Sequence, residues 1–82
     1  MVERFDLELL SDEAKLLCGI NERFDNEPLN VQRLRFEFAK ITQRLCIQRE
    51  SAGRSEAGRN FSIAITELEN VCIRAIKWLY SV

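Results

Sequence analysis

Residues 59–80 read RNFSIAITELENVCIRAIKWLY, and this segment has the strongest helical pattern in the chain. It holds neither proline nor glycine, and its apolar residues recur every three or four positions, which is the period of an amphipathic helix. We therefore predict a helix over residues 59–80. Its buried seam is expected to comprise Phe61, Ile65, Leu68, Cys72, Ala75 or Ile76, and Leu79.

A second apolar line runs along the same predicted helix. The residues of this line and of its margins are Ala64, Val71, Trp78, Ile63, Ile73 and Tyr80. A helix that is apolar over most of its circumference must be covered on more than one side. Because a chain of 82 residues offers little else to cover it, we expect self-association. The alternative is a compact three-helix monomer that leaves some apolar surface exposed.

The preceding part of the chain predicts a partner for this helix. Residues 29–50 carry a seam of the same type, formed by Val31, Leu34, Phe38, Ile41 and Leu45. Residues 51–58 hold two glycines and two serines and no large apolar residue, which is typical of a connection. Two helices of similar length with matching seams and a short link favour an antiparallel hairpin.

A shorter helix is expected over residues 11–24. Ser11 is a suitable N-cap, and Asp12 and Glu13 then lie where the helix dipole favours negative charge. The polar residues before Pro28 predict its end, because a residue that precedes proline avoids helical geometry. The sequence thus predicts one all-α domain over residues 1–82. It consists of a short N-terminal helix and a long antiparallel helical hairpin, assembled as a homo-oligomer.

Composition narrows the possible functions. The chain has no histidine, no Gly-rich phosphate loop and no Ser-centred elbow, so we expect no enzyme and no catalytic residues. Its three cysteines are widely separated, which favours reduced core thiols over a zinc site or disulfides, and no metal or cofactor is expected. The acidic N-terminal stretch is unlike a signal peptide, and no apolar run reaches the roughly 18 residues of a membrane span. We expect a soluble cytosolic protein without a membrane partner.

The basic part of the chain is its middle. Residues 31–66 contain seven basic and three acidic residues, whereas residues 1–30 contain three basic and eight acidic ones. Arg59, Ser62 and Thr66 are spaced three and four apart, so they share one face at the start of the last helix, where free backbone N–H groups attract anions. This pattern indicates a phosphate site, to which Asn60 could also contribute. The structural alternative is that Ser55 or Asn60 caps the helix and that Thr66 bonds back to an earlier carbonyl group.

The pattern Arg59-x-x-Ser62-x-Ala64-Ile65-Thr66-x-Leu68-Glu69, followed by Ala75 and Lys77, resembles the final helix of a phage protein family. The family is that of the anti-CBASS cyclic-nucleotide sponges, whose helical-hairpin domain some anti-Thoeris proteins share. The resemblance covers about the last 24 residues. The chain departs from it at Arg74, where the family often has an aromatic residue, and in a longer hairpin tip over residues 51–58.

The resemblance implies a homo-hexamer that binds cyclic di- or trinucleotides without cleaving them, in the cytoplasm of the infected bacterial host. It places Arg59 against phosphates, and Ser62 and Thr66 against ribose, phosphate or base edges. A second pocket, for dinucleotides, uses an aromatic and a basic residue near the N-terminal helix. Phe5, Arg23 and Phe24 are candidates for it by residue type alone, with a core role for Phe24 as the alternative.

Two other functions stay open. A small helical adaptor would bind a protein partner through an open apolar groove on a helix. A nucleic-acid binder is suggested by the arginines between Arg33 and Arg59, but the net charge of −1 and the missing helix-turn-helix pattern count against duplex binding.

Overall fold

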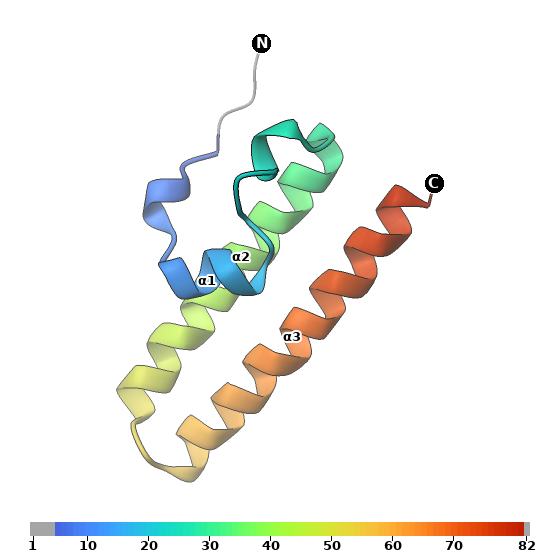
Figure 1. Ribbon diagram of the computed structural model, residues 1–82. Coiled ribbons are helices and arrows are strands. Elements are labelled where there is room, and N and C mark those ends of the chain that lie inside the picture. Colours follow the sequence, from blue (N-terminus) through green and yellow to red (C-terminus); the bar gives the residue numbers. More distant parts are fainter. Residues whose placement is uncertain (1–4, 82) are drawn as a thin grey trace.

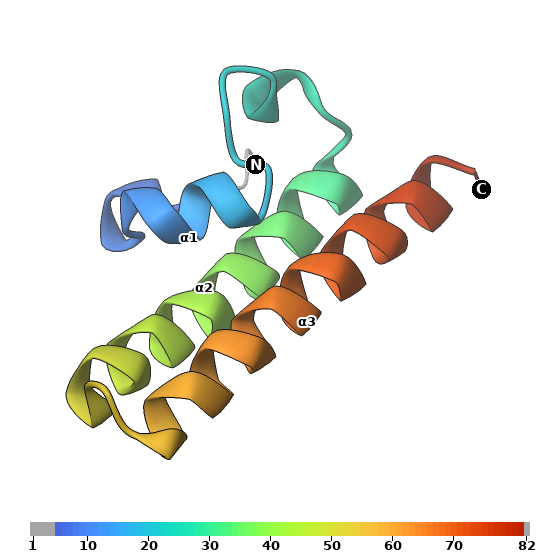
Figure 2. The ribbon, with the colours of Figure 1, turned by 60° about the horizontal axis from the view of Figure 1, so that its bottom comes forward.

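The computed structural model describes residues 5–81, and this part of the chain is all-helical, without strands (Figure 1). The elements are η1 (Leu7–Leu9), α1 (Asp12–Leu17), η2 (Phe24–Asn26), α2 (Leu29–Ala52) and α3 (Glu56–Tyr80). The long helices α2 and α3 lie side by side as an antiparallel hairpin, and the N-terminal segment packs across α2 (Figures 1 and 2). The predicted all-α class and hairpin are confirmed. None of the helices in residues 5–81 has the length and apolarity that a membrane crossing needs.

The first helix is shorter than predicted. Ser11 is its N-cap, as expected, and accepts a hydrogen bond from the Ala14 amide at 3.2 Å. The helix ends at Leu17 instead of residue 24 because Gly19 adopts a φ of +73°. The Gly19 amide donates to the Leu16 carbonyl oxygen and the Ile20 amide to that of Lys15. These are the two bonds of a Schellman C-cap, which needs a left-handed residue that glycine adopts without strain.

Both long helices continue further into the predicted connection than expected. α2 continues to Ala52, where Gly53 ends it with a φ of +64°, and α3 begins at Glu56 instead of residue 59. The connection is therefore residues 53–55 instead of 51–58. Gly58 is not part of a loop but lies in the first turn of α3.

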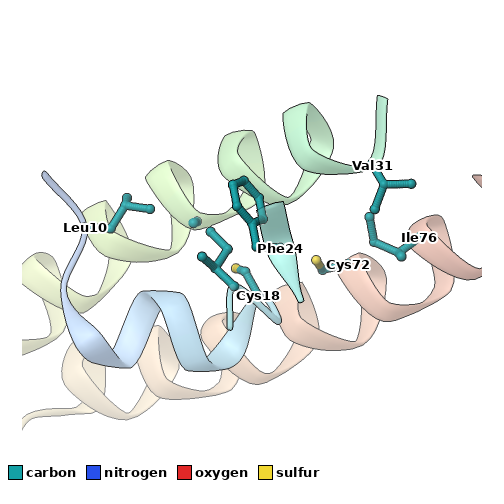
Figure 3. Packing of buried hydrophobic residues seen from close by; sticks show 8 residues of the cluster. Leu10, Cys18, Phe24, Val31, Cys72 and Ile76 are labelled. Atoms are coloured by element: carbon teal, nitrogen blue, oxygen red, sulfur yellow. The ribbon is translucent and has the colours of Figure 1, made fainter. Parts of the chain in front are cut away.

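The core lies where the N-terminal segment meets both long helices. Figure 3 shows part of this cluster, with Val31 of α2 beside Ile76 of α3 and with Cys18 and Cys72 near the middle. Cys18, Thr42 and Cys72 form a three-helix junction, in which each residue is about 1% exposed. The Cys18 Sγ and Thr42 Oγ1 atoms are 3.4 Å apart, at hydrogen-bonding distance. Small side chains occupy this junction because three backbones converge there.

The predicted seam of α3 is confirmed, whereas that of α2 is partly wrong. Every predicted seam residue of α3 is buried or half-buried. On α2 the most deeply buried residues are Val31, Ala39, Thr42 and Cys46, and the predicted seam residue Ile41 is 48% exposed. The reason is that α2 is covered on two sides, by α3 and by the N-terminal segment. Its buried face is centred between these two neighbours and does not point at α3 alone.

Long polar side chains of α2 hold the N-terminal segment by its backbone. The Gln43 amide nitrogen donates to the Leu9 carbonyl oxygen at 2.6 Å, and its amide oxygen accepts from the Ser11 N–H at 2.6 Å. The Gln32 amide nitrogen donates to the carbonyl oxygens of Phe24 and Glu27 at 2.8 and 3.1 Å. Paired backbone groups of this kind let an irregular segment pack on a helix without leaving polar atoms unsatisfied.

Candidate functional site

The start of α3 is built by a serine cap. Ser55 is the N-cap, and its Oγ accepts a hydrogen bond from the Gly58 amide at 3.1 Å and donates one to the Ala52 carbonyl oxygen at 2.9 Å. Of the two capping residues that the sequence allows, Ser55 has this role. Arg59 therefore lies one turn inside the helix, not at its end. Its N–H is not one of the free groups of the helix start, because it donates to the Ser55 carbonyl oxygen.

The position of this turn depends on a close contact between two glycines. Gly58 is buried, and a Cβ atom built on it would overlap the carbonyl oxygen of Gly53. The backbone of the hairpin tip thus rests directly against the first turn of α3. This contact and the Ser55 cap together fix the direction in which α3 leaves the tip, and with it the position of Arg59.

The structure places Arg59, Ser62 and Thr66 on one exposed face of α3. A surface cavity of about 380 Å³ adjoins this face and is lined by Ser55, Glu56 and Arg59. Asn60 is also exposed but points about 100° away around the helix. The face is available to a ligand, and within one protomer it is open and shallow.

Both hydroxyl groups on this face are engaged with the helix backbone. The Ser62 Oγ donates to the Gly58 carbonyl oxygen at 3.2 Å, and the Thr66 Oγ1 donates to the Ser62 carbonyl oxygen at 3.2 Å. The back-bonding expected as the structural alternative is therefore present. Because a hydroxyl oxygen keeps its lone pairs when its hydrogen is donated, Ser62 and Thr66 can still accept hydrogen bonds from a ligand.

The charges around the hairpin tip nearly balance within one protomer. Arg49 near the end of α2 is bound to Glu13 of α1, with 2.6 Å between Nη2 and Oε1. This hydrogen bond holds the pKa of the Glu13 carboxyl below its usual value. The acidic N-terminal segment thus pairs with an arginine of α2 inside the protomer. Arg54 and Arg59 are exposed at the tip beside the acidic Glu56.

The structure does not support a stacking site built from Phe5 and Phe24. Phe24 is 2% exposed and belongs to the core, and Phe5 packs edge-to-face against it with 5.8 Å between ring centroids. Phe5 also contacts Phe36 at 5.1 Å. The prediction that Phe24 stacks on a base is wrong, because its ring faces are covered by the N-terminal segment and α2. The core alternative for this residue is confirmed.

Arg23 lies apart from these rings, at a polar cavity that sequence reasoning missed. The cavity is about 530 Å³ in volume. Arg23, Arg35 and Tyr80 are among its lining residues, and they come from the η2 segment, α2 and the end of α3. The sequence does not indicate that these residues lie together, because Arg23 and Tyr80 are 57 positions apart.

A partly buried ion pair, Arg35 with Glu27, lines this polar cavity. The Arg35 Nε and Nη2 atoms lie 2.8 and 3.1 Å from the two carboxylate oxygens of Glu27, and the side chains are 17% and 11% exposed. Arg35 Nη1 also donates to the Cys18 carbonyl oxygen at 3.1 Å, and the Tyr80 hydroxyl donates to Glu27 at 2.6 Å. The hydrogen bond to Glu27 raises the pKa of Tyr80. This network joins the end of α3 to the η2 segment.

The three cysteines are free thiols in the interior. A hydrogen bond with Cys18 together with burial raises the pKa of Cys72, and burial raises that of Cys46 to about 11. Cys46 and Cys72 are therefore weak nucleophiles, because the reactive form is the thiolate, whereas the hydrogen bond with Cys72 lowers the pKa of Cys18 to about 7. Among residues 5–81 no group of three His, Cys, Asp or Glu side chains gathers in a way that could hold a metal ion.

Comparisons of the chain with protein-family models, with curated proteins and with solved structures gave no match.

Proposed function

We propose that this protein is a phage sponge that binds cyclic oligonucleotide second messengers without cleaving them and so blocks CBASS immunity. The observation that carries the proposal is the exposed face of Arg59, Ser62 and Thr66 beside a cavity at the start of α3. These three residues are also part of the longer pattern over residues 59–77 that resembles the sponge family. The short tip over residues 53–55 also removes one of the two departures from the family pattern.

The three residues suit different parts of a cyclic nucleotide. A guanidinium makes short, charge-assisted hydrogen bonds to phosphate, so Arg59 is assigned to the cyclic phosphates. The hydrogens of Ser62 and Thr66 are donated to the helix backbone, which leaves their oxygens as acceptors. A phosphate offers no hydrogen to such an oxygen, whereas a ribose 2′-hydroxyl or a base N–H does. Ser62 and Thr66 are therefore assigned to ribose or base edges.

One protomer supplies only part of a pocket. Tight sites bury most of their ligand, and the face around Arg59 is shallow and carries Glu56 close by. Several copies that meet at their hairpin tips would enclose a ligand. Each copy would add its own Arg59, so several arginines would face the phosphates of one cyclic nucleotide. The proposal therefore includes a homo-oligomer, and the family resemblance implies six copies.

The cavity beside Arg23 is the better candidate for a second, dinucleotide pocket. It combines an exposed arginine with the exposed ring of Tyr80, and both planes can stack on a base. Phe24 is buried in the core and the half-buried Phe5 packs against it, so Arg23 is the candidate of the three that we retain.

The alternative function is an adaptor that binds a helix of another protein. It is favoured by an apolar surface groove of about 460 Å³ on the outer side of α3. Val71, Ala75 and Trp78 line this groove together with polar residues. An adaptor of this kind does not need Arg59, and this difference separates the two functions.

Thermal unfolding of the purified protein against a panel of cyclic di- and trinucleotides tests the proposal. A ligand that binds only the folded state, at 100 times its dissociation constant, stabilises it by about 2.7 kcal/mol. The bound nucleotide should be recovered chemically intact after denaturation of the protein. No stabilisation by any member of the panel would contradict the sponge function and favour the adaptor.

A matched pair of variants then tests the site itself by calorimetric titration. Arg59→Ala should abolish tight binding of at least one cyclic nucleotide while the helical content stays unchanged. Arg54→Ala removes the same charge from the neighbouring, exposed tip position and serves as the control. Equal losses in the two variants would indicate unspecific attraction to positive charge instead of a site at Arg59.

A further inference from the structure

The outer side of α3 has an apolar stripe that no other part of residues 5–81 covers. α3 packs on α2 along its inner side and forms the free edge of the fold (Figures 1 and 2). On the outer side Trp78 is 67% and Val71 53% exposed. Trp78 lines two neighbouring surface hollows, of about 460 and 590 Å³. An indole ring this exposed is typical of an interface residue, because it carries a large apolar area that water solvates poorly.

The spacing of the outer stripe is that of a helix-pairing seam. Ala64, Val71 and Trp78 lie seven residues apart, and Glu67 and Arg74 fall between them. A seven-residue repeat keeps one line of side chains facing a second helix over its whole length. The occupant of the stripe is therefore expected to be a helix that runs alongside α3, not a loop or a strand.

The charges of the stripe identify that helix. Glu67 lies four residues before Val71 and Arg74 three residues after it, and both side chains are exposed. Within residues 5–81 neither of them forms a salt bridge. A two-fold axis near Val71 would bring Glu67 of each copy beside Arg74 of the other. Two symmetry-related ion pairs would then form across the interface. A parallel arrangement would instead place equal charges side by side.

The side-chain sizes along the stripe agree with the same axis. Trp78 follows Val71 by seven residues and Ala64 precedes it by seven, so an antiparallel copy would set the large ring of one helix against the small residue of the other. Large residues opposite small ones allow two helices to pack closely without voids. Charge and size thus lead to one register.

We propose that α3 pairs antiparallel with α3 of a second copy of this chain, across a two-fold axis near Val71, through the stripe of Ala64, Glu67, Val71, Arg74 and Trp78. Such an isologous contact is self-complementary, because each residue of the stripe meets a residue of the same stripe. The pairing does not depend on a nucleotide ligand. It concerns one interface of the assembly, so a protein that forms its oligomer through another face would contradict this pairing and leave the proposed function intact.

Charge reversal tests the register by light scattering. Glu67→Arg and Arg74→Glu should each lower the mass at least twofold, because each creates two pairs of like charges. The double variant should recover the wild-type mass, and an equimolar mixture of the two single variants should form mixed assemblies. Arg44→Glu reverses an exposed charge on α2 and is the control. A monomeric wild-type protein at 100 µM, or a double variant that fails to regain mass while both singles lose it, would overturn the proposal.

Cross-linking through one introduced, exposed cysteine per chain tests the direction of the helices, because the three native cysteines are buried. With a diazene dicarboxamide as the two-electron oxidant, two thiols lose their hydrogens to it and form one disulfide. Val71→Cys should give a covalent dimer at the axis. Ile63→Cys should not, because the two positions in an antiparallel pair lie about 24 Å apart along the axis. Dimers from both variants would indicate parallel helices, and dimers from neither would place the contact elsewhere; each result contradicts the proposal.

Discussion

Replacing Gly58 with alanine sets two opposite effects against each other in α3. Alanine is a better helix former than glycine by up to about 1 kcal/mol, so an isolated helix would gain stability. In the folded protein a Cβ at this position would overlap the carbonyl oxygen of Gly53 and lie 3.2 Å from its carbonyl carbon. These are backbone atoms of the hairpin tip, which cannot rotate away as the end of a flexible side chain can.

The balance should favour destabilisation. Overpacking against neighbours that cannot yield costs about 1–3 kcal/mol. A shift of the tip would also weaken the Ser55 cap, because the Gly58 amide donates its hydrogen bond to the Ser55 hydroxyl, and such a cap contributes about 1 kcal/mol. We therefore expect a net loss of about 1–3 kcal/mol after the gain in helix propensity. For a domain of this size each kcal/mol corresponds to roughly 4–8 °C in Tm.

Urea unfolding followed by circular dichroism, at one fixed protein concentration, measures this loss. Ala57→Gly is the matched control, because residue 57 is exposed in the same turn and should lose no more than about 1 kcal/mol. A Gly58→Ala variant as stable as the wild type, or more stable, would refute the close contact between the tip and α3. The position of Arg59 would then need another explanation.

Three further changes probe the contacts that hold the N-terminal segment. Gly19→Ala should destabilise the protein by about 1–3 kcal/mol in urea unfolding, because it forces a φ of +73° on an L-residue and displaces the Arg35 guanidinium. Unchanged stability would contradict the C-cap of α1 at Gly19. Arg35→Met should cost about 3 kcal/mol because it removes the charged partner of the partly buried Glu27 and leaves it the neutral Tyr80 hydroxyl, whereas the exposed Arg44→Met should stay within about 0.5 kcal/mol. A smaller loss for Arg35 would show that the pair is solvated. Arg49 lowers the pKa of Glu13, so the pair stabilises the fold above the unfolded pKa of 4.5, and this contribution is lost as the pH falls through the lowered folded value. The stability difference between wild type and Glu13→Gln should therefore be constant at pH 5–7 and shrink toward pH 3, and a difference that grows on acidification would be inconsistent with the pair.

The hairpin and the face of α3 could be predicted because their signal is local. The apolar period of residues 59–80 repeats over six turns, and one buried face is all that α3 presents to its neighbour. The exposure of Arg59, Ser62 and Thr66 follows from the same period. The helix start at Ser55 was predicted only as one of two possible caps, because Ser55 and Asn60 both have the side chain for the role and their choice depends on the packing of the tip.

The first helix and the buried face of α2 were predicted less well, for two different reasons. Gly19 marks the end of α1, and its local signal was present in the sequence, but we predicted the end from the polar residues before Pro28 instead. The buried face of α2 has no local signal of this kind. Gln32 and Gln43 look like solvent-facing residues, and their partners are backbone groups of a segment up to 34 residues away. Arg35 likewise depends on Glu27 and Tyr80, which only the folded chain brings together.

The proposed α3 pairing and the proposed ligand site use different parts of one helix, and this limits how copies can be arranged. Val71 follows Arg59 by 12 residues, which is about 18 Å along an α-helix. An antiparallel pair centred near Val71 therefore keeps its two Arg59 side chains about 36 Å apart, too far for one cyclic nucleotide to contact both. A pocket that gathers several α3 starts must be closed by a second interface, between hairpin tips. When its axis is perpendicular to a three-fold axis at the tips, a two-fold contact along α3 closes the assembly at six copies, with one cluster of tips at each end of the particle. In that arrangement Glu67→Arg would divide the hexamer into trimers that keep the ligand site, whereas Arg59→Ala would abolish ligand binding and leave the hexamer intact.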